Sequence, residues 1–403
     1  MKILLINQPL NNRGDEAAHK ALIRTLLVKI PNIQIKVLYV DCYSQEGLNQ
    51  FKIPSLNVDY VNIKSFWWYS VIGPRSLINN KSFLWPIHPT THDVIKVYSW
   101  ADFVVCAPGG ICMGGFQNWE HLFFLKLAKY CKKPLIYYGR SVGPFPTETK
   151  NNRLFKKISL EMLDYMSFIA IRDLKSNMIL KDFHKACSLT VDTAFLEKPN
   201  VSLPYEIKKL IGTKPYIVFV PNYLLWHYAY KNQGTEEDLT DFFSNIGKGI
   251  LKQYPDCNIV MLPQTFANEN KEDNDIIFFR KIAEKINDNR ILLTADCYSS
   301  DIQQTLISKA SFLVGARYHS IVFAINQNIP FISLSYEHKM TGLLQCLDLT
   351  EYEIDIQNIF KEKQNILNLF YTKIKTNIVK PNVQEKAQSI AYECTNKLLN
   401  IMK

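Results

Sequence analysis

The sequence predicts an α/β protein built from two Rossmann-like domains that face each other across a cleft. Two observations carry this prediction. The length of 403 residues exceeds what a single core usually fills, and short apolar runs alternate with amphipathic helical patterns along the whole chain. Near-continuous apolar runs are typical of parallel strands covered by helices on both faces. The content of 47% hydrophobic and 21% charged residues is that of an ordinary globular protein.

Ten apolar runs are expected to form strands, five in each half of the chain. The runs of the first half are ILLI (3–6), IKVLYV (35–40), FVVCA (103–107), PLIYYG (134–139) and FIAI (168–171). The runs of the second half are YIVFV (216–220), NIVMLP (258–263), ILLT (291–294), SFLVG (311–315) and PFISLS (330–335). The proline-containing stretch 197–214 is the expected linker, so we place an N-terminal domain at 1–200 and a C-terminal domain at 210–380. Residues 381–403 are expected to form a helix that packs back on the N-terminal domain.

The net charge of +10 is confined to one half of the chain. Residues 1–200 hold 25 Lys and Arg against 15 Asp and Glu, whereas residues 201–403 hold 22 of each kind. A basic half suggests a polyanionic partner (a nucleic acid, a phosphorylated substrate or an anionic membrane surface), unless it only keeps the protein soluble. No Lys- or Arg-rich helix and no recognised binding motif supports nucleic acid, so we expect no nucleic-acid partner.

The nine cysteines are scattered singly, without the spacing of a zinc site or the even count of a disulfide framework. We therefore expect buried thiols in a reducing cytoplasm and no structural metal. No run approaches the ~18 apolar residues of a membrane span. The N-terminal residues MKILLINQPL lack a small-residue cleavage site, so they are expected to form a first buried strand and not a signal peptide.

In open α/β sheets, ligands bind beyond the carboxyl ends of the strands, so the polar residues that follow each run are the candidate site residues. After the first run, Asn12 and Gly14 form a turn and Asp15 falls where a helix N-cap belongs. Asp15 then either only caps the helix or, with the backbone N–H groups beside it, holds an acceptor hydroxyl in the cleft. After FVVCA, four glycines lie within seven residues, among them Gly109 and Gly110, which permit close approach of a ligand to the backbone.

Two further loops each deliver an arginine, Arg140 after PLIYYG and Arg172 after FIAI. Two guanidinium groups at neighbouring strand ends can clamp an anion through charge-assisted hydrogen bonds. The alternative for a single arginine is a salt bridge, and Arg172 would then brace the domain with the adjacent Asp173. Because two arginines occupy corresponding loop positions, we favour the anion clamp.

The second half offers hydrogen-bonding groups after almost every expected strand. These groups are Asn222, Gln264, Arg317, His319, Glu337 and Lys339. A helix that begins near His319 would add its positive N-terminal end to the charge of Arg317 and form an anion pocket. His319 can then act as an acid or a base, because histidine changes its protonation state near neutral pH. The alternative is a histidine that only caps its helix.

With these residues placed, the sequence resembles the polysaccharide pyruvyl transferases. The resemblance rests on seven blocks in family order: NNRGDEAAHKAL (11–22), DFVVCAPGG (102–110), YYGRSVGPF (137–145), IAIRDLKS (169–176), TVDTAF (190–195), VMLPQ (260–264) and GARYHSIVFAINQNIPFISLSYEHKMTGLL (315–344). The last block is the most specific: R-x-H-[ST] is followed by an apolar helix, a turn that ends in proline, and a strand that leads to a lysine. Together the blocks span most of the chain.

The resemblance implies a two-domain fold like that of the B-type glycosyltransferases. It also implies transfer of the pyruvyl group of phosphoenolpyruvate to two hydroxyls of a sugar, as a ketal with release of phosphate. The C-terminal domain would then bind phosphoenolpyruvate, with Arg317 and His319 at the site and Lys339 close by. Arg140 and Arg172 carry over as residues that line the cleft, although glutamine or a similar polar residue is expected more often at position 140. Phosphoenolpyruvate is the co-substrate, and this chemistry requires no further cofactor, nucleotide or metal.

From these residues we expect Arg317, Arg172 and Lys339 to bind the anionic groups of phosphoenolpyruvate. We expect His319 to protonate it and Asp15 to act as a base toward the acceptor. The residues expected on the acceptor side of the cleft are Asn12, Asp15, Gly109, Gly110, Arg140, Asn222, Gln264 and Glu337.

Residues 66–100 hold four of the six tryptophans and few acidic residues. Tryptophan and tyrosine stack on sugars and are also enriched at membrane interfaces. Together with the basic first half, this suggests a peripheral contact with the inner face of the membrane. The acceptor would be an oligosaccharide carried on undecaprenyl diphosphate, a precursor of a cell-surface or capsular polysaccharide. The alternative is a tryptophan-rich insert that packs into the core.

Two rival functions stay open at this point. A glycosyltransferase of the same architecture that uses a nucleotide-sugar donor would bind a nucleoside diphosphate. A non-catalytic module that binds sugar or membrane would have lost the transferase chemistry, and the presence of Arg317, His319 and Lys339 argues against it.

Overall fold

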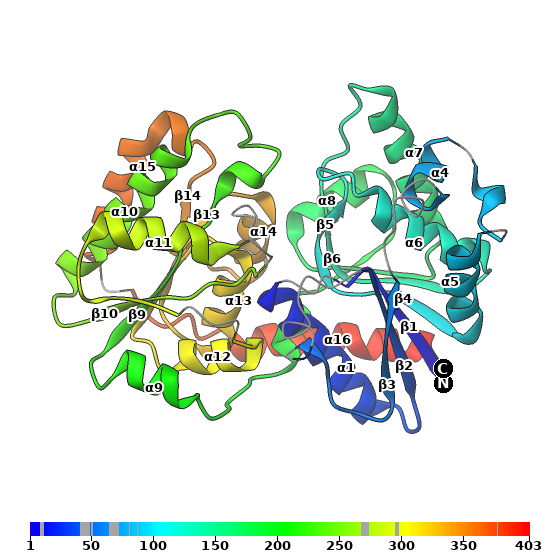
Figure 1. Ribbon diagram of the computed structural model, residues 1–403, viewed down its shortest axis with the longest axis horizontal. Helices are drawn as coiled ribbons and strands as arrows, with labels where there is room; N and C mark the ends of the chain where they lie inside the picture. The colour runs from blue at the N-terminus through cyan, green and yellow to red at the C-terminus, as the bar shows by residue number, and fades with distance from the viewer. Residues whose placement is uncertain are drawn as a thin grey trace.

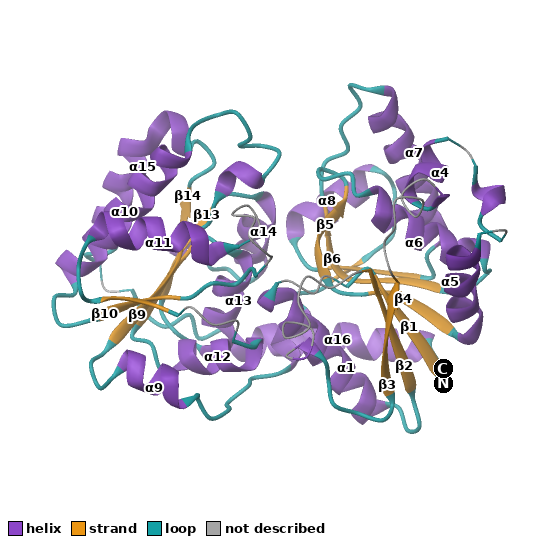
Figure 2. Ribbon diagram, in the orientation of Figure 1, coloured by secondary structure: helices purple, strands orange, loops and turns teal. Residues whose placement is uncertain are grey.

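In the computed structural model, the chain forms two α/β domains side by side, each with one twisted sheet between layers of helices (Figure 1). The structure describes residues 1–403 except 9–11, 41–48, 50, 64–71, 80, 87, 267–273, 295–297 and 377. The strands lie inside each domain and the helices outside (Figure 2). The predicted fold class, an α/β protein of two Rossmann-like domains, is confirmed.

The N-terminal domain contains an eight-stranded sheet in the order β3-β2-β1-β4-β6-β7-β8, with β5 paired to β6. Its strands are β1 (Lys2–Ile6), β2 (Gln34–Val40), β3 (Val58–Ile63), β4 (Phe103–Cys106), β5 (Gly109–Met113), β6 (Leu135–Val142), β7 (Phe168–Ile171) and β8 (Ser188–Leu189). Every pair of neighbouring strands is parallel. The carboxyl ends of the strands therefore lie along one edge, where the loops of the domain collect.

Helices and short turns connect these strands. They are α1 (Arg13–Lys29), α4 (Pro74–Ile78), η1 (Ser82–Leu84), α5 (Pro89–Trp100), α6 (Trp119–Tyr130), α7 (Lys150–Tyr165), α8 (Leu174–Asp182) and η2 (Thr193–Leu196). Side-chain oxygens cap several of them: Asn118 caps α6, Thr149 caps α7 and Asp173 caps α8. Such caps satisfy backbone N–H groups that have no partner inside the helix, and they fix where each loop ends.

The C-terminal domain contains a six-stranded parallel sheet in the order β11-β10-β9-β12-β13-β14. Its strands are β9 (Tyr216–Val220), β10 (Asn258–Met261), β11 (Ile291–Leu293), β12 (Phe312–Gly315), β13 (Phe331–Ser335) and β14 (Glu353–Asp355). Its helices and turns are α9 (Tyr205–Ile211), η3 (Leu224–Trp226), α10 (Glu236–Gln253), α11 (Asp275–Ile286), α12 (Ser300–Ser308), α13 (Tyr318–Gln327), α14 (His338–Cys346), η4 (Thr350–Tyr352) and α15 (Ile359–Lys373). The expected linker 197–214 is thus not wholly irregular, since it contains the short helix α9.

Helix α16 (Gln384–Ile401) returns to the N-terminal domain, as expected. Its residues Cys394 and Leu398 are buried in the same apolar cluster as Ile3 and Leu5 of β1. Thr395 is hydrogen-bonded to the hydroxyl of the buried Tyr138 at 2.7 Å. In Figure 1 the helix, drawn in red, runs beneath the N-terminal sheet close to α1.

An ionic cluster joins the two domains where α1 meets the start of α12. The carboxylate of Glu16, which is fully buried, accepts hydrogen bonds from the backbone N–H and the hydroxyl of Ser300, both at 3.0 Å. The same carboxylate binds Lys20 at 2.6 Å and Arg13 at 2.5 Å. A buried anion is stable only when it is paired in this way, so this contact holds α1 of the first domain against the second.

Candidate functional site

The N-terminus of α1 touches the loops of the opposite domain. Asn12 caps α1, because its side chain accepts hydrogen bonds from the backbone N–H groups of Gly14 and Asp15. The backbone N–H of Arg13 donates to the carbonyl oxygen of Gln264 at 2.9 Å. The prediction that Asp15 occupies the N-cap is wrong: Asn12 does, and Asp15 lies in the first turn of the helix. Asn12 has the extended backbone of an N-cap residue, and from this position its side-chain oxygen reaches the first free N–H groups of the helix.

Helix α13 begins opposite α1. It starts at Tyr318, so the prediction of a helix that begins near His319 is confirmed. No side chain caps it, which leaves His319 to face other partners. An ideal Cβ built on Gly14 would lie only 1.9 Å from Cγ and Nδ1 of His319, so the glycine packs directly on the imidazole. The ring therefore sits where the two domains meet.

A buried carboxylate connects His319 with Arg172. Nε2 of His319 lies 3.4 Å from Oδ2 of Asp192, and Nη1 of Arg172 donates to the same oxygen at 2.5 Å. Burial alone would raise the pKa of the Asp192 carboxyl, but the charges of Arg172 and His319 lower it to about 2. The partner of Arg172 is therefore Asp192 and not the adjacent Asp173, which caps α8. Asp192 stays ionised and can stabilise a protonated imidazole.

Cations from both domains converge on one aromatic ring. The guanidinium carbon of Arg172 lies 4.4 Å from the centroid of Tyr318, and Nζ of Lys339 lies 5.8 Å from it. Lys339 is also 2.8 Å from Oε2 of Glu337. Burial opposes the charge of Lys339, but the carboxylate of Glu337 raises the pKa of its ammonium group above the ordinary value. The positive charge of Arg172 lowers the pKa of Lys339 by repulsion, because the two cations lie close together.

Arg317 faces the loop after β10. Its guanidinium group binds the carboxylate of Asp275 and donates to the hydroxyl of Thr265 at 3.1 Å. Asp275 also accepts the backbone N–H groups of Gln264 and Thr265, at 2.9 and 3.0 Å. Arg317 thus ties the start of α13 to the loop that touches Arg13, and its Nε is buried with no hydrogen-bond partner among the described residues.

Arg140 is fully buried behind the glycine-rich segment. Its guanidinium group donates to the carbonyl oxygen of Asn7 at 3.3 Å and lies 3.8–3.9 Å from the sulfurs of Cys112 and Cys106. An ideal Cβ on Gly109 would lie 2.6 Å from Nη2, so a side chain at this position would force the guanidinium group to shift. Within the described part of the chain, no carboxylate lies within 4.0 Å of this cation.

The other predicted acceptor-side residues occupy different positions along the interface. Gly109 and Gly110 begin β5, so the stretch expected to be a loop is partly a strand. A Cβ on Gly110 would meet no atom within 4 Å. The amide of Asn222 is used internally, because it donates to the carbonyl of Ala316 and accepts from the indole of Trp226, both at 3.3 Å.

Comparison with known proteins decides the family. Residues 12–338 match the family described as polysaccharide pyruvyl transferase. The chain belongs to the polysaccharide pyruvyl transferase family. This pyruvyl transferase is 22% identical over 387 residues to the amylovoran biosynthesis protein AmsJ of Erwinia amylovora, with 89% of each chain covered. It is therefore a transferase of polysaccharide biosynthesis.

Solved structures with a similar fold support the architecture of this pyruvyl transferase. The UDP-GlcNAc 2-epimerase from Neisseria meningitidis, bound to UDP-GlcNAc, has a TM-score of 0.58 at 14% identity, over 99% of this chain and 100% of that one. The putative UDP-N-acetylglucosamine 2-epimerase from Listeria monocytogenes has a TM-score of 0.59 at 12% identity, covering 98% and 94%. Arabidopsis thaliana UGT89C1 complexed with UDP has a TM-score of 0.55 at 8% identity, covering 98% and 99%. At these identities the likeness concerns the fold alone.

Several residues of the pyruvyl transferase site were not singled out from the sequence. Asp192 lies in the block TVDTAF and Asp275 follows a polar loop, but neither carried a pattern that marks a partner for a distant arginine. His227 lies between Trp226 and Tyr228, which favour a core position, and Tyr318 lies between Arg317 and His319, the two residues on which the prediction rested. The one feature of the sequence that could have identified these four residues is their position, because each of them follows a strand at the edge of a sheet where the loops lie.

The tryptophan-rich segment 66–100 is only partly described. Trp67 and Trp68 lie outside the described residues. Trp85 is buried, contacts Phe123 at 5.4 Å between ring centroids and donates to the hydroxyl of Ser76, so this residue packs into the core. Phe83, two residues earlier, is 67% exposed. Among the helices that the structure describes, none has the length and apolar character needed to cross a membrane.

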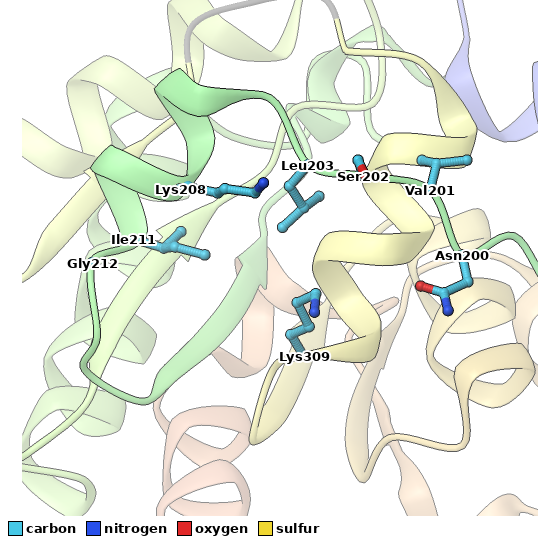
Figure 3. Close-up of a pocket in the computed structure, with 8 residues that line it drawn as sticks. All are labelled: Asn200, Val201, Ser202, Leu203, Lys208, Ile211, Gly212 and Lys309. Carbon is cyan, nitrogen blue, oxygen red and sulfur yellow. The ribbon is translucent and has the colours of Figure 1, made fainter.

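A separate pocket of about 480 Å³ lies between α9, the linker and the end of α12 (Figure 3). Its lining residues are Asn200, Val201, Ser202, Leu203, Lys208, Ile211, Gly212 and Lys309. None of the predicted site residues lies in it. The arrangement around His319 at the domain interface is therefore the candidate active site of this pyruvyl transferase.

Proposed function

We propose that this pyruvyl transferase takes its pyruvyl group from phosphoenolpyruvate and forms a ketal across two hydroxyls of a sugar. The observation that carries the proposal is the convergence of Arg172 and Lys339, from opposite domains, over the ring of Tyr318. Phosphoenolpyruvate carries a carboxylate and a phosphate, so a site that joins cations of two domains suits it. The donor would share these cations with Asp192 and Glu337, and Arg317 would add a third positive charge at the start of α13.

His319 is the proposed acid. Its Nε2 faces Asp192, so Nδ1, on the side of Gly14, is the nitrogen that would act on the donor. Protonation of the methylene carbon of phosphoenolpyruvate makes the adjacent carbon electrophilic, and one sugar hydroxyl adds there. Phosphate then leaves, and the second hydroxyl closes the ring. One hydroxyl proton restores His319, and the other is taken by Asp15 and passed to the leaving phosphate, so the acid and the base are both regenerated in each cycle.

Asp15 is the proposed base toward the acceptor. Its side chain is 7% exposed, and Oδ1 is buried without a hydrogen-bond partner among the described residues. A buried carboxylate oxygen that lacks a partner is unusual in a folded protein and suits a group that awaits a hydroxyl. The acceptor would lie along Asn12, Gly109, Gly110, Asn222 and Gln264, which were predicted for this side of the cleft.

We further propose an acceptor oligosaccharide carried on undecaprenyl diphosphate, which would place the enzyme in the cytoplasm with a peripheral contact at the inner membrane face. Exposed Phe83, which follows exposed Arg75 and Lys81 in the same segment of the chain, supports this contact. An apolar ring among basic residues favours an anionic membrane surface. The product would be a precursor of a cell-surface or capsular polysaccharide, and the reaction would need no cofactor beyond phosphoenolpyruvate.

The decisive experiment is incubation of the enzyme with phosphoenolpyruvate and a panel of lipid-linked galactosides and hexosamines. We expect a product heavier by one pyruvate less one water, with phosphate released in equal amount. A matched reaction with UDP-sugars in place of phosphoenolpyruvate tests the rival glycosyltransferase function. Sugar transfer in that reaction, without phosphate release in the first, would overturn the proposal.

The membrane contact has a test of its own. Replacement of Trp67 and Trp68 by serine should reduce sedimentation with vesicles of anionic phospholipid, while the far-ultraviolet circular dichroism stays unchanged. Replacement of buried Trp85 is not a suitable control, because it would disturb the core. Wild-type binding to the vesicles by the double variant would exclude a contact through these two residues.

A further inference from the structure

A second histidine lies beside the donor-binding cation Lys339. His227 follows the turn η3 at the carboxyl end of β9, is only 2% exposed, and belongs to no sequence block of the family. Its Nε2 lies 3.4 Å from Oε1 of Glu337, a carboxylate that is itself 3% exposed. Both groups are thus buried at the domain interface.

A single hydrogen bond defines the tautomer of His227. The backbone N–H of Ala229 donates to Nδ1 at 3.2 Å. Nδ1 therefore carries no hydrogen, and the single N–H of the neutral ring is on Nε2, which faces Glu337. Since both nitrogens are directed to protein groups, His227 is arranged to hold Glu337 and not to exchange protons with a substrate.

Glu337 has two oxygens and each faces a different side chain. Oε1 faces His227, and Oε2 lies 2.8 Å from Nζ of Lys339. Burial would raise the pKa of Glu337, but Lys339 and His227 lower it well below the ordinary value, so the carboxylate stays charged. The chain of contacts from Ala229 through His227 and Glu337 ends at the ammonium group of Lys339, beside Arg172.

The opposite side of His227 touches the N-terminal domain. Phe116, just after the glycine-rich segment, meets the imidazole edge-on at 5.1 Å and stacks on Trp226 at 5.4 Å with an interplanar angle of 9°. An ideal Cβ on Gly115 would lie 2.6 Å from the hydroxyl of Tyr228, so glycine permits this close approach of the two loops. The contact exists only while the two domains are together.

We propose that His227 is a positioning residue that fixes Lys339 through Glu337, and that Phe116 makes this arrangement depend on the approach of the N-terminal domain. The inference rests on the proposed donor, because it assigns Lys339 to phosphoenolpyruvate. It explains why a histidine, and not an apolar residue, occupies a buried position among aromatic rings. The ammonium group of Lys339 would then be fixed in its binding position only when the two domains are closed.

The test compares His227→Gln with His227→Leu. The glutamine amide can still donate toward Glu337, whereas leucine fills the space without a donor. For His227→Leu we expect the KM for phosphoenolpyruvate to rise at least tenfold, with less than a twofold change in the KM for the acceptor. His227→Gln should recover most of this loss. Equal KM values for the two variants, with unchanged thermal midpoints, would reduce His227 to a packing role and overturn the proposal.

The domain dependence is tested with Phe116→Ala, which should raise the KM for phosphoenolpyruvate in the same direction. Phe183→Ala is the matched control, because Phe183 is also half-buried and meets another ring, Phe145, edge-on at 5.6 Å within the N-terminal domain. Phe183→Ala should leave the KM for phosphoenolpyruvate within twofold. An equal effect of the two substitutions would contradict the coupling.

A readout that needs no substrate separates this inference from the proposed function. Reductive methylation with ¹³C-formaldehyde labels Lys339, and a Lys339→Arg variant identifies its resonance. We expect the titration of this resonance to shift to lower pH in His227→Leu but not in His227→Gln. If the wild-type enzyme does not turn over phosphoenolpyruvate, this shift still supports the positioning role, and its absence would overturn it.

Discussion

Gly14 packs directly on His319, so that α1 of one domain and α13 of the other meet at the imidazole ring. A methyl group at position 14 would overlap the ring at 1.9 Å. We expect Gly14→Ala to lower the free energy of unfolding by about 1–3 kcal/mol, because overpacking forces the ring or the helix to move, and to reduce turnover. Denaturant unfolding and a phosphate-release assay measure the two effects.

The cause of this effect can be isolated with a double-mutant cycle. If the clash is with His319, Gly14→Ala should cost much less stability in the background His319→Ala, where the ring is absent. Gly110→Ala adds the same methyl group in open space and should leave the thermal midpoint unchanged. Additive losses in the double variant would show that the glycine is needed for another reason.

His319→Ala should lower turnover by ~10²–10⁴-fold, since this is the usual contribution of a positioned acid or base. The fold should persist, because His319 forms no cap of α13. His92→Ala, at an exposed position of α5, is the control and should keep wild-type turnover. Near-normal turnover of His319→Ala in the same assay would show that another group protonates the donor.

Asp192 should make the stability of the protein depend on pH in the acid range. Its pKa in the folded state, about 2, lies below the ordinary value of 3.8, so the ionised carboxylate stabilises the fold above pH ~4. This contribution is lost as the pH falls from about 4 toward 2. Asp192→Asn leaves Arg172 buried without its carboxylate and should cost on the order of 3–5 kcal/mol at pH 7.

Urea unfolding of both proteins between pH 7 and pH 3 tests this prediction. The difference in unfolding free energy between wild type and Asp192→Asn should be largest at neutral pH and should shrink as the solution becomes acid. Parallel curves over the whole range would mean that the carboxylate is not held in its charged form by the fold.

Glu16 should be the most sensitive single position of the domain interface. Glu16→Gln removes the charge that binds Arg13 and Lys20, both buried, and weakens the bonds to Ser300. We expect a loss on the order of 3–5 kcal/mol in the free energy of unfolding. Lys397→Ala breaks an exposed ion pair with Glu393 and serves as the control, with no measurable change. Similar small effects of both substitutions would show that the interface does not depend on this charge.

Much of the fold followed from apolar runs alone. The run 216–220 coincides with β9, and the run 168–171 coincides with β7. Four strands were missed. β8 (Ser188–Leu189) and β14 (Glu353–Asp355) are too short to form an apolar run, and the other two lack such a run for different reasons. β3 (Val58–Ile63) is an edge strand with alternating polar residues, and β5 (Gly109–Met113) contains the glycines that were interpreted as a loop. Neither has the continuous apolar character that a central parallel strand requires.

The site was only partly predictable for a different reason. The loops that carry Arg172, Arg317 and His319 were identified because ligands of open α/β sheets bind beyond the carboxyl ends of the strands. The partners Asp192 and Asp275 come from distant parts of the chain, and a single sequence contains no signal that couples them to a particular arginine. Ion pairs of this kind depend on how helices and loops dock, which only the folded structure shows.

Helix α16 has a consequence for the order in which the molecule is made. The apolar face of β1 is covered by Cys394 and Leu398, which the ribosome adds only after the entire second domain. Domains usually fold as units in the order of their synthesis, but here the first domain to emerge lacks part of its own core until the last helix arrives. The nascent chain therefore carries a sheet face that α1 covers only in part through most of translation, and the two domains reach their final state together.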